Sequence, residues 1–197
     1  MPEKDILTLA KEYQERARAV VAEAGVIAAW KSIGAEINQV GSLRMGLLIK
    51  HLDIDFHIYT DRFSLADSFK AAHALAENPR VKRIWFMNGL DTDEKCVEWH
   101  AWYTDERGDE WQLDMIHIVR GSRYDGHFER VADKISARLT DKTRRAILEI
   151  KNSVPDTEKI PGIEIYKAVL NHGVTDYAGL KEWRKNNPQT GIVDIEV

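Results

Sequence analysis

The sequence predicts an α/β (α+β) protein, with a mixed β-sheet and flanking helices followed by a helical C-terminal region. Three observations predict it. Residues 3–24 place apolar side chains at helical spacing, several runs in the middle of the chain have the composition or the alternation of strands, and the pattern is helical again from residue 124 onward. We therefore expect two regions, a core with an N-terminal helix over 1–120 and a helical region over 121–197.

The composition limits the classes of protein that the chain can represent. Its 197 residues suit one domain, since domains commonly contain about 100–200 residues. The single cysteine, Cys96, excludes an internal disulfide and a cysteine zinc site, which indicates a reducing compartment. Met1–Ile6 lacks the order of a signal peptide, and no apolar run approaches a bilayer span, so we expect a cytoplasmic protein and no membrane contact.

Helices and strands alternate in the first part of the chain. Gly25 is placed to end the first helix, Ser64 is placed to cap a later one, and Asn78-Pro79 ends it. The expected elements are a helix over 3–24, a short apolar stretch over 26–33, a strand over 35–40, a helix over 43–51, a strand over 53–59 and a helix over 65–76.

A hairpin and a series of helices are expected after residue 80. Residues 105–109 include a glycine and separate two strand-like runs, which is typical of a hairpin loop. Pro155 and Pro161 make 152–162 the best candidate linker. The expected elements are strands over 81–88, 96–104 and 111–119, then helices over 124–139, 143–151, 163–171 and 175–185.

Three features of the core indicate chemistry on phosphates. Gly41-Ser42 follows a strand and opens a helix, so backbone N–H groups and a hydroxyl turn toward one point. Asp53 and Asp55 lie two apart on a strand and share a face, an arrangement that a hard cation stabilises. Asp114 is an isolated charge in an apolar strand, and it completes a three-carboxylate cluster if that strand is a neighbour.

These residues resemble the motif of the nucleotidyltransferase superfamily of DNA polymerase β type. The match consists of Val40-Gly41-Ser42, then Asp53-Ile54-Asp55, then an apolar-flanked Asp114, within residues 36–118. The resemblance implies a nucleotidyltransferase-type fold. It also implies that Asp53 and Asp55 bind Mg²⁺, with Mn²⁺ as an alternative, that Asp114 helps to activate an acceptor hydroxyl, and that Gly41 and Ser42 hold a nucleoside triphosphate such as ATP.

The leading functional hypothesis is transfer of a nucleoside monophosphate from a triphosphate to an acceptor hydroxyl. Proximity makes Arg44 or Lys50 the candidate that neutralises the phosphates. A formal charge of −4, the helical last third and a layout similar to that of antibiotic nucleotidyltransferases favour a small-molecule acceptor over a long nucleic acid. The basic segment 122–151, with eight bases against five acids, keeps a tRNA end or a nucleotide open as the acceptor.

Alternatives remain at this point. A metal-dependent glycosyltransferase could use Asp53-Ile54-Asp55, and a non-catalytic, antitoxin-like member of the same fold would act by binding a partner. The carboxylates could also belong to an exposed edge strand, with Asp114 paired to Arg44 or Arg83. His57 is expected to be structural more often than functional, Cys96 to be buried, and the tryptophans to serve the core and the sheet surface rather than a stacking platform.

Overall fold

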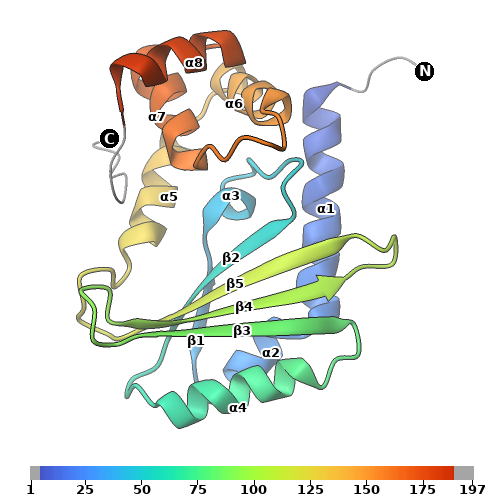
Figure 1. Ribbon diagram of the computed structural model, residues 1–197, viewed down its shortest axis with the longest axis vertical. Coiled ribbons are helices and arrows are strands. Elements are labelled where there is room, and N and C mark those ends of the chain that lie inside the picture. Colours follow the sequence, from blue (N-terminus) through green and yellow to red (C-terminus); the bar gives the residue numbers. More distant parts are fainter. Residues whose placement is uncertain (1–4, 189–197) are drawn as a thin grey trace.

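A mixed sheet of five strands, in the order β1-β2-β5-β4-β3, forms the centre of the computed structural model, which describes residues 5–188 (Figure 1). The start of the first expected helix and most of the segment tested for a signal peptide lie outside these residues. The strands are β1 Glu36–Gln39, β2 Asp53–Tyr59, β3 Val81–Gly89, β4 Cys96–Thr104 and β5 Glu110–Ile118. The helices are α1 Ile6–Ala24, α2 Val26–Lys31, α3 Gly41–Arg44, α4 Leu65–Ala76, α5 His127–Arg138, α6 Asp141–Ser153, α7 Gly162–His172 and α8 Tyr177–Asn186.

β2 and β5 pair in parallel, whereas the other neighbouring strands of the sheet pair antiparallel. β2 lies between β1 and β5, so it is not an edge strand, and the alternative that placed its carboxylates on an exposed edge is wrong. In the parallel pair Asp55 is the partner of Asp114. Residues that are partners in neighbouring strands point to the same side of a sheet, so the pairing decides which side chains meet.

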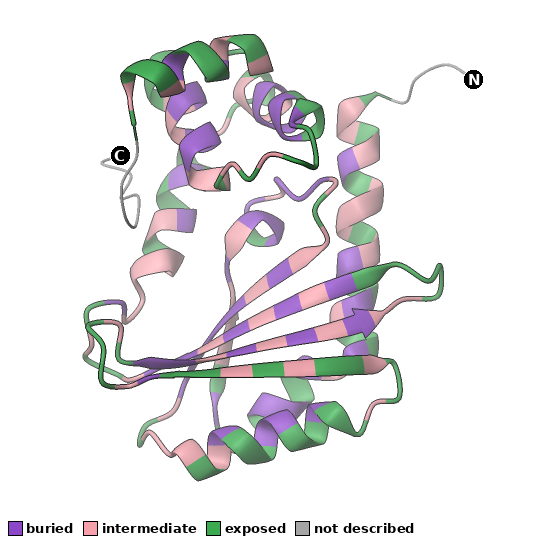
Figure 2. Cartoon of the chain, in the orientation of Figure 1, coloured by how far each residue is buried: buried purple, intermediate pink, exposed green. Residues whose placement is uncertain are grey.

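The two faces of the sheet have different neighbours. On one face, α1, α2 and α4 pack with the inward residues of the strands around a cluster that includes Trp30, Phe56 and Trp111. The other face is turned toward α5–α8, which have a cluster of their own that includes Ile147 and Leu180 (Figure 1). The alternation of buried and partly exposed residues is plain along β4 and β5 (Figure 2). Thus the partly exposed residues of the sheet lie beneath the C-terminal helices.

Most expected elements are present, and one differs. The predicted helix over 43–51 is wrong, since α3 ends at Arg44 and both Gly46 and Lys50 have positive φ angles, of 67° and 64°. Leu47, Leu48 and Ile49 are fully buried, and each belongs to a different core cluster. In an α-helix, consecutive side chains are turned by about 100° around one narrow cylinder. Three consecutive side chains that pack into three separate clusters therefore require an irregular backbone.

Local signals place the ends of several helices correctly. Gly25 ends α1 with a φ of 74°, and the Ser64 hydroxyl accepts a hydrogen bond from the Asp67 amide at the start of α4. Within residues 5–188 no helix is both long enough and apolar enough to cross a membrane.

Candidate active site

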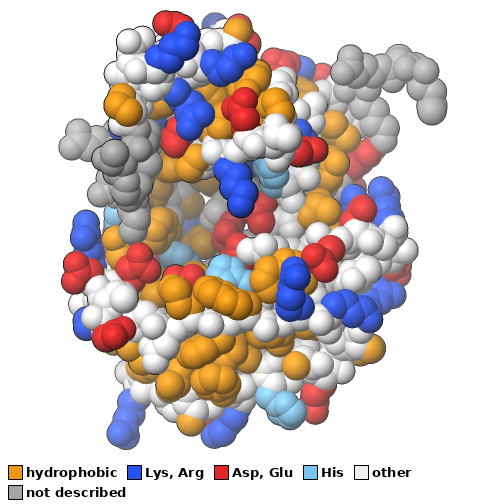
Figure 3. Space-filling view, in the orientation of Figure 1, with side chains coloured by type: hydrophobic (Ala, Val, Ile, Leu, Met, Phe, Trp, Pro, Cys, Tyr) orange, Lys and Arg blue, Asp and Glu red, His pale blue; other side chains and the backbone are white. Residues whose placement is uncertain are grey.

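A cleft of about 940 Å³ separates the sheet from the C-terminal helices and contains the expected carboxylates. Its floor comes from β2 and β5, and its upper wall comes from α5, α7 and the 154–162 connection. Figure 3 shows this hollow, with acidic and histidine side chains at its centre and hydrophobic side chains on the sheet below it. The cleft is large enough for a nucleotide-sized ligand, since typical small-molecule sites measure about 300–1,000 Å³.

The three aspartates come together on the floor of the cleft. Asp55 is the register partner of Asp114, and Asp53 lies two residues earlier on the same face of β2. Burial raises the pKa of Asp55 to about 7, and the negative charges of Asp53 and Asp114 add to the effect, while the positive charge of Lys151 opposes it. The raised pKa shows that the positive charge near Asp55 does not balance the negative charges around it.

The donor set fits a divalent cation with oxygen ligands. Three carboxylates on neighbouring strands supply the hard oxygen atoms that Mg²⁺ takes, and a bound cation would relieve the repulsion that raises the pKa of Asp55. Asp53, Asp55 and Asp114 are therefore the residues that would hold the metal.

Gly41 approaches Asp55 so closely that no other residue fits at this position. Its φ is 64°, and a Cβ atom built on Gly41 would lie 1.8 Å from Oδ2 of Asp55. Ser42 follows at the start of α3, and it is buried and lines the cleft. The turn after β1 thus brings backbone and a hydroxyl directly against the carboxylates.

Lys151, near the end of α6, is a buried cation of the cleft that was not among the site residues expected from the sequence. It is 7% exposed, it lines the cleft, and its Nζ donates a hydrogen bond of 2.9 Å to the Leu47 carbonyl. Burial lowers the pKa of Lys151 to about 8, against the opposing influence of Asp53 and Asp55. A signal was present in the sequence, since Lys151 follows Ile147 by four residues on the apolar face of the predicted helix.

The two cations that proximity suggested have other partners than the three aspartates. Arg44 forms an ion pair with Asp133 at 2.7 Å and donates to the Gln39 carbonyl. Lys50 donates to the Val154 carbonyl at 2.6 Å and pairs with Asp156. Neither Arg44 nor Lys50 is among the described residues that line the cleft.

Asp114 has a histidine and an amide as its hydrogen-bond partners rather than an arginine. Its carboxylate shares hydrogen bonds with Nδ1 of His100 and with the Gln112 amide, the latter at 2.7 Å, and Nε2 of His100 lies 3.3 Å from Glu98. The alternative that paired Asp114 with Arg44 or Arg83 is therefore wrong. His57 also lines the cleft, where its Nδ1 lies 3.4 Å from Glu129 on α5.

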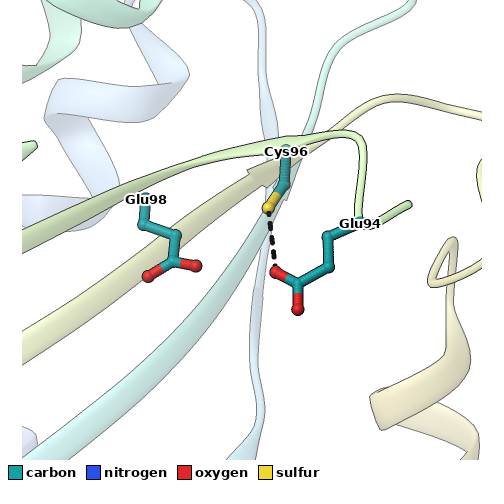
Figure 4. Close-up of side chains that lie close together, drawn as sticks. All are labelled: Glu94, Cys96 and Glu98. Atoms are coloured by element: carbon teal, nitrogen blue, oxygen red, sulfur yellow. Dashed lines mark hydrogen bonds between the residues drawn. The ribbon is translucent and has the colours of Figure 1, made fainter. Parts of the chain in front are cut away.

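A second group of potential metal ligands lies at the start of β4 and in the turn before it. Side-chain atoms of Glu94, Cys96 and Glu98 fall within 4.8 Å of one another (Figure 4). Cys96 is buried, and burial together with the charges of Glu98 and Glu94 raises the pKa of its thiol to about 12. The thiol is thus protonated at neutral pH and behaves as the buried apolar group that the sequence predicts.

Comparisons with known proteins identify the fold. No protein-family model matches the chain, and no curated protein matches it in sequence. Among solved structures, the MgGTP-bound Cid1 poly(U) polymerase superposes with a TM-score of 0.58 at 16% identity, covering 82% of this chain and 50% of the other. A cytoplasmic RNA terminal U-transferase gives a TM-score of 0.53 at 16% identity, over 82% of this chain and 46% of that one.

The non-canonical poly(A) polymerase complex GLD-2–GLD-3 covers more of both chains. It gives a TM-score of 0.57 at 12% identity, over 94% of this chain and 64% of the other. The present chain spans about half the length of the first two proteins. Identities this low establish the architecture rather than a shared substrate. The mixed five-stranded sheet and the helices around it therefore form the nucleotidyltransferase fold of DNA polymerase β type.

Proposed function

We propose that the protein transfers a nucleoside monophosphate from a nucleoside triphosphate to a hydroxyl group of an acceptor. The observation that carries the proposal is the parallel register of Asp55 with Asp114 on the floor of the cleft, with Asp53 on the same face and Gly41 against Asp55. Carboxylates so arranged would hold divalent cations such as Mg²⁺, which would supply the positive charge that stabilises phosphoryl transfer.

The proposed reaction is a single displacement at the α-phosphorus. The acceptor oxygen forms a bond to the α-phosphorus while the bond from that phosphorus to the bridging oxygen breaks, and pyrophosphate leaves. The hydroxyl proton passes to the Asp114 carboxylate, which is oriented by Gln112 and His100. Asp114 is the carboxylate on the β4 side of the site, so the acceptor would approach over β5 and β4.

The triphosphate is assigned to the opposite side of the carboxylates. Gly41 and Ser42 offer backbone and hydroxyl donors there, and Lys151 supplies a positive charge from α6. Arg44 and Lys50 already pair with Asp133 and Asp156, so Lys151 is the cation that we assign to the phosphates. The apolar residues of α5 and α7 that line the cleft, such as Val131 and Ile163, offer a surface for the base.

A small molecule is the proposed acceptor. The segment 91–114 supplies β4, its hairpin and most of β5, and it contains nine acids against two bases. Such a surface repels a polyanion such as a long nucleic acid.

The proposal is tested by incubating the protein and Mg²⁺ with labelled ATP, GTP, CTP or UTP and a metabolite extract, and by measuring pyrophosphate. We expect release from at least one triphosphate in the wild type, and a loss of roughly 1,000-fold or more in an Asp53→Asn, Asp55→Asn variant, since both metal ligands are removed. Asp93→Asn is the matched control, because Asp93 is an exposed acid in the turn between β3 and β4 and does not line the cleft.

The products separate this proposal from its rivals. Release of a nucleoside diphosphate from a sugar nucleotide would indicate a glycosyltransferase instead. Absence of pyrophosphate, together with no metal-dependent heat of triphosphate binding in calorimetry, would indicate a protein that acts by binding a partner. Unchanged activity in the Asp53→Asn, Asp55→Asn variant would disprove the assignment of the carboxylates.

A further inference from the structure

A single row of side chains crosses four strands of the sheet and leads out of the cleft. Asp55 on β2 is partnered with Asp114 on β5, Asp114 with His100 on β4, and His100 with Trp85 on β3. Because the spacing between neighbouring strands is about 4.8 Å, Trp85 stands roughly 10 Å from Asp114 along this row. The row therefore joins the expected site of phosphoryl transfer to an aromatic surface at the edge of the sheet.

Trp85 differs from the other tryptophans of the sheet in its exposure. Trp99 and Trp111 are 3% and 0% exposed and belong to the core, whereas Trp85 is 47% exposed. The indole of Trp85 packs at one side on His100, with ring centroids 5.0 Å apart. The ring of Trp102, in the next row, is covered by the Arg83 guanidinium at 3.8 Å from its centroid. Among the described residues no cation lies over Trp85 in this way.

Charge around the exposed indole disfavours an anionic ligand. Met87, two residues along β3, is the register partner of Glu98, which in turn contacts His100. On the other side Arg83 lies 3.5 Å from Glu110, so its charge is compensated. Aromatic faces are themselves negative and attract neutral rings or cations. In Figure 3 hydrophobic side chains of the sheet extend directly below the histidine and acidic groups of the hollow.

We propose that Trp85, backed by His100, binds a planar ring of the acceptor that carries no negative charge. The acceptor would be a small molecule with this ring within about 10 Å of its reacting hydroxyl, so that a ring stacked on Trp85 places the hydroxyl at Asp114. This inference rests on the proposed nucleotidyl transfer and adds the chemistry of the second substrate to it. The edge of the sheet then serves as the acceptor site and the helical wall as the nucleotide site.

Adenosine and ribose are suitable probes, because they share a hydroxyl-bearing sugar and only adenosine has a planar, uncharged ring. Their binding is measured by ligand-observed NMR, with Mg²⁺ and a saturating non-hydrolysable ATP analogue present to occupy the nucleotide side. We expect saturable binding of adenosine and none of ribose. Trp85→Ala should weaken adenosine binding about tenfold or more, and Trp85→Phe should keep it within about threefold, because stacking requires only an aromatic face.

Phe69→Ala is the matched control, since Phe69 is also 47% exposed but packs on Phe86 and Trp99, on the α4 side of the sheet. Phe69→Ala should leave adenosine binding unchanged, and Trp85→Ala should leave the affinity for the ATP analogue unchanged. Equal adenosine binding in Trp85→Ala and wild type would overturn the proposal. So would equal binding of ribose, or tighter, strongly salt-dependent binding of an adenylate oligonucleotide, which would indicate a nucleic acid strand.

The same measurements separate this inference from the proposed function. The Asp53→Asn, Asp55→Asn variant should retain the Trp85-dependent binding of adenosine, because the indole lies outside the carboxylate cluster. If the wild type binds adenosine through Trp85 but releases no pyrophosphate with any acceptor, nucleotidyl transfer fails and the ring site stands. If pyrophosphate is released but adenosine binding does not depend on Trp85, the ring site fails and nucleotidyl transfer stands.

Discussion

Gly41 illustrates, at the scale of the residue, how a missing side chain serves the site. The turn after β1 places the Gly41 backbone against the Asp55 carboxylate, and any Cβ at this position would overlap Oδ2 of Asp55. The left-handed backbone conformation, with φ at 64°, adds a second reason for glycine. Both the positive φ and the close contact favour glycine at this turn, but only the contact affects the position of the Asp55 carboxylate.

Gly41→Ala is therefore expected to reduce activity far more than backbone strain alone explains. Displacing Asp55 by the added methyl group should lower kcat/KM roughly 100-fold, measured as pyrophosphate release with a saturating acceptor. Gly108→Ala is the matched control, because Gly108 also has a positive φ, of 84°, but no atom lies near its added Cβ. Gly108→Ala should lose about 1–2 kcal/mol of unfolding free energy through backbone strain, and Gly41→Ala should lose more because its Cβ also overlaps Asp55. Equal loss of activity in both would show that the contact with Asp55 has no role.

At the scale of the element, α6 connects the helical region with the carboxylates. The helix begins with a capping box formed by Thr140 and Thr143, and it ends near Lys151, whose ammonium reaches the Leu47 carbonyl beneath the cleft. Ile147 and Ile150 bury the same face of α6 in the helical core. The packing of this face therefore fixes the position of a positive charge beside Asp53 and Asp55.

Lys151→Met is the test of α6 as a source of charge for the phosphates. A charged hydrogen bond contributes about 1.5–3 kcal/mol, so we expect the KM for the triphosphate to rise roughly 10–100-fold, with the KM for the acceptor nearly unchanged. Lys142→Met, an exposed lysine of the same helix, should change neither constant. If Lys151→Met lowers thermal stability but leaves the triphosphate KM as in wild type, the lysine is structural only.

At the scale of the whole molecule, the sheet has a polar face toward the cleft and an apolar face toward α1, α2 and α4. His117 lies on the apolar face, where it is fully buried between Trp30 and Phe63 and shares a hydrogen bond of 3.0 Å with the Thr60 hydroxyl. Among the described residues its Nδ1 has no hydrogen-bond partner. Burial lowers the pKa of His117 to about 4.

His117 should therefore lower the stability on acidification, whereas Asp55, whose pKa the fold raises to about 7, contributes with the opposite sign over nearly the same window. The unfolded chain takes up a proton on His117 near pH 6.5, whereas the folded protein does so only near pH 4, so unfolding is favoured as the pH falls between these values. The expected slope is up to about 1.4 kcal/mol per pH unit, measured by urea denaturation. Relative to the wild type, His117→Gln should lose this contribution to the slope while the Asp55 contribution stays the same, and the exposed His73→Gln should not change the slope. An unchanged slope in His117→Gln would exclude His117 as its source.

Asp105 affects a lower pH window, so the two contributions can be separated. Burial alone would raise the pKa of Asp105, but hydrogen bonds from Arg16 and Trp111 outweigh it and lower the pKa to about 2. Its stabilising contribution is complete above the unfolded pKa of about 3.9 and is lost as the pH falls toward 2. Between pH 6.5 and pH 4 the difference in slope between wild type and His117→Gln therefore reports His117 and not Asp105.

Much of the fold could be predicted because its signals are local. The alternation over 53–59 marks β2 at its observed bounds, and the hairpin of β4 and β5 follows from its turn residues. The helix expected over 43–51 failed because its apolar run, which has helical composition, is divided among three clusters. In this segment tertiary packing overrides the local helical propensity of the residues.

By itself the sequence determined the mixed-sheet fold class, the carboxylate spacing of Asp53 and Asp55, and the expected chemistry, because period and spacing act over a few residues. Only the tertiary structure decided which groups share the cleft. It aligned Asp55 with Asp114, extended that row to Trp85, and brought Lys151 to Leu47 from 104 residues away. Contacts of that range depend on strand register and helix packing, which no local pattern in one chain specifies.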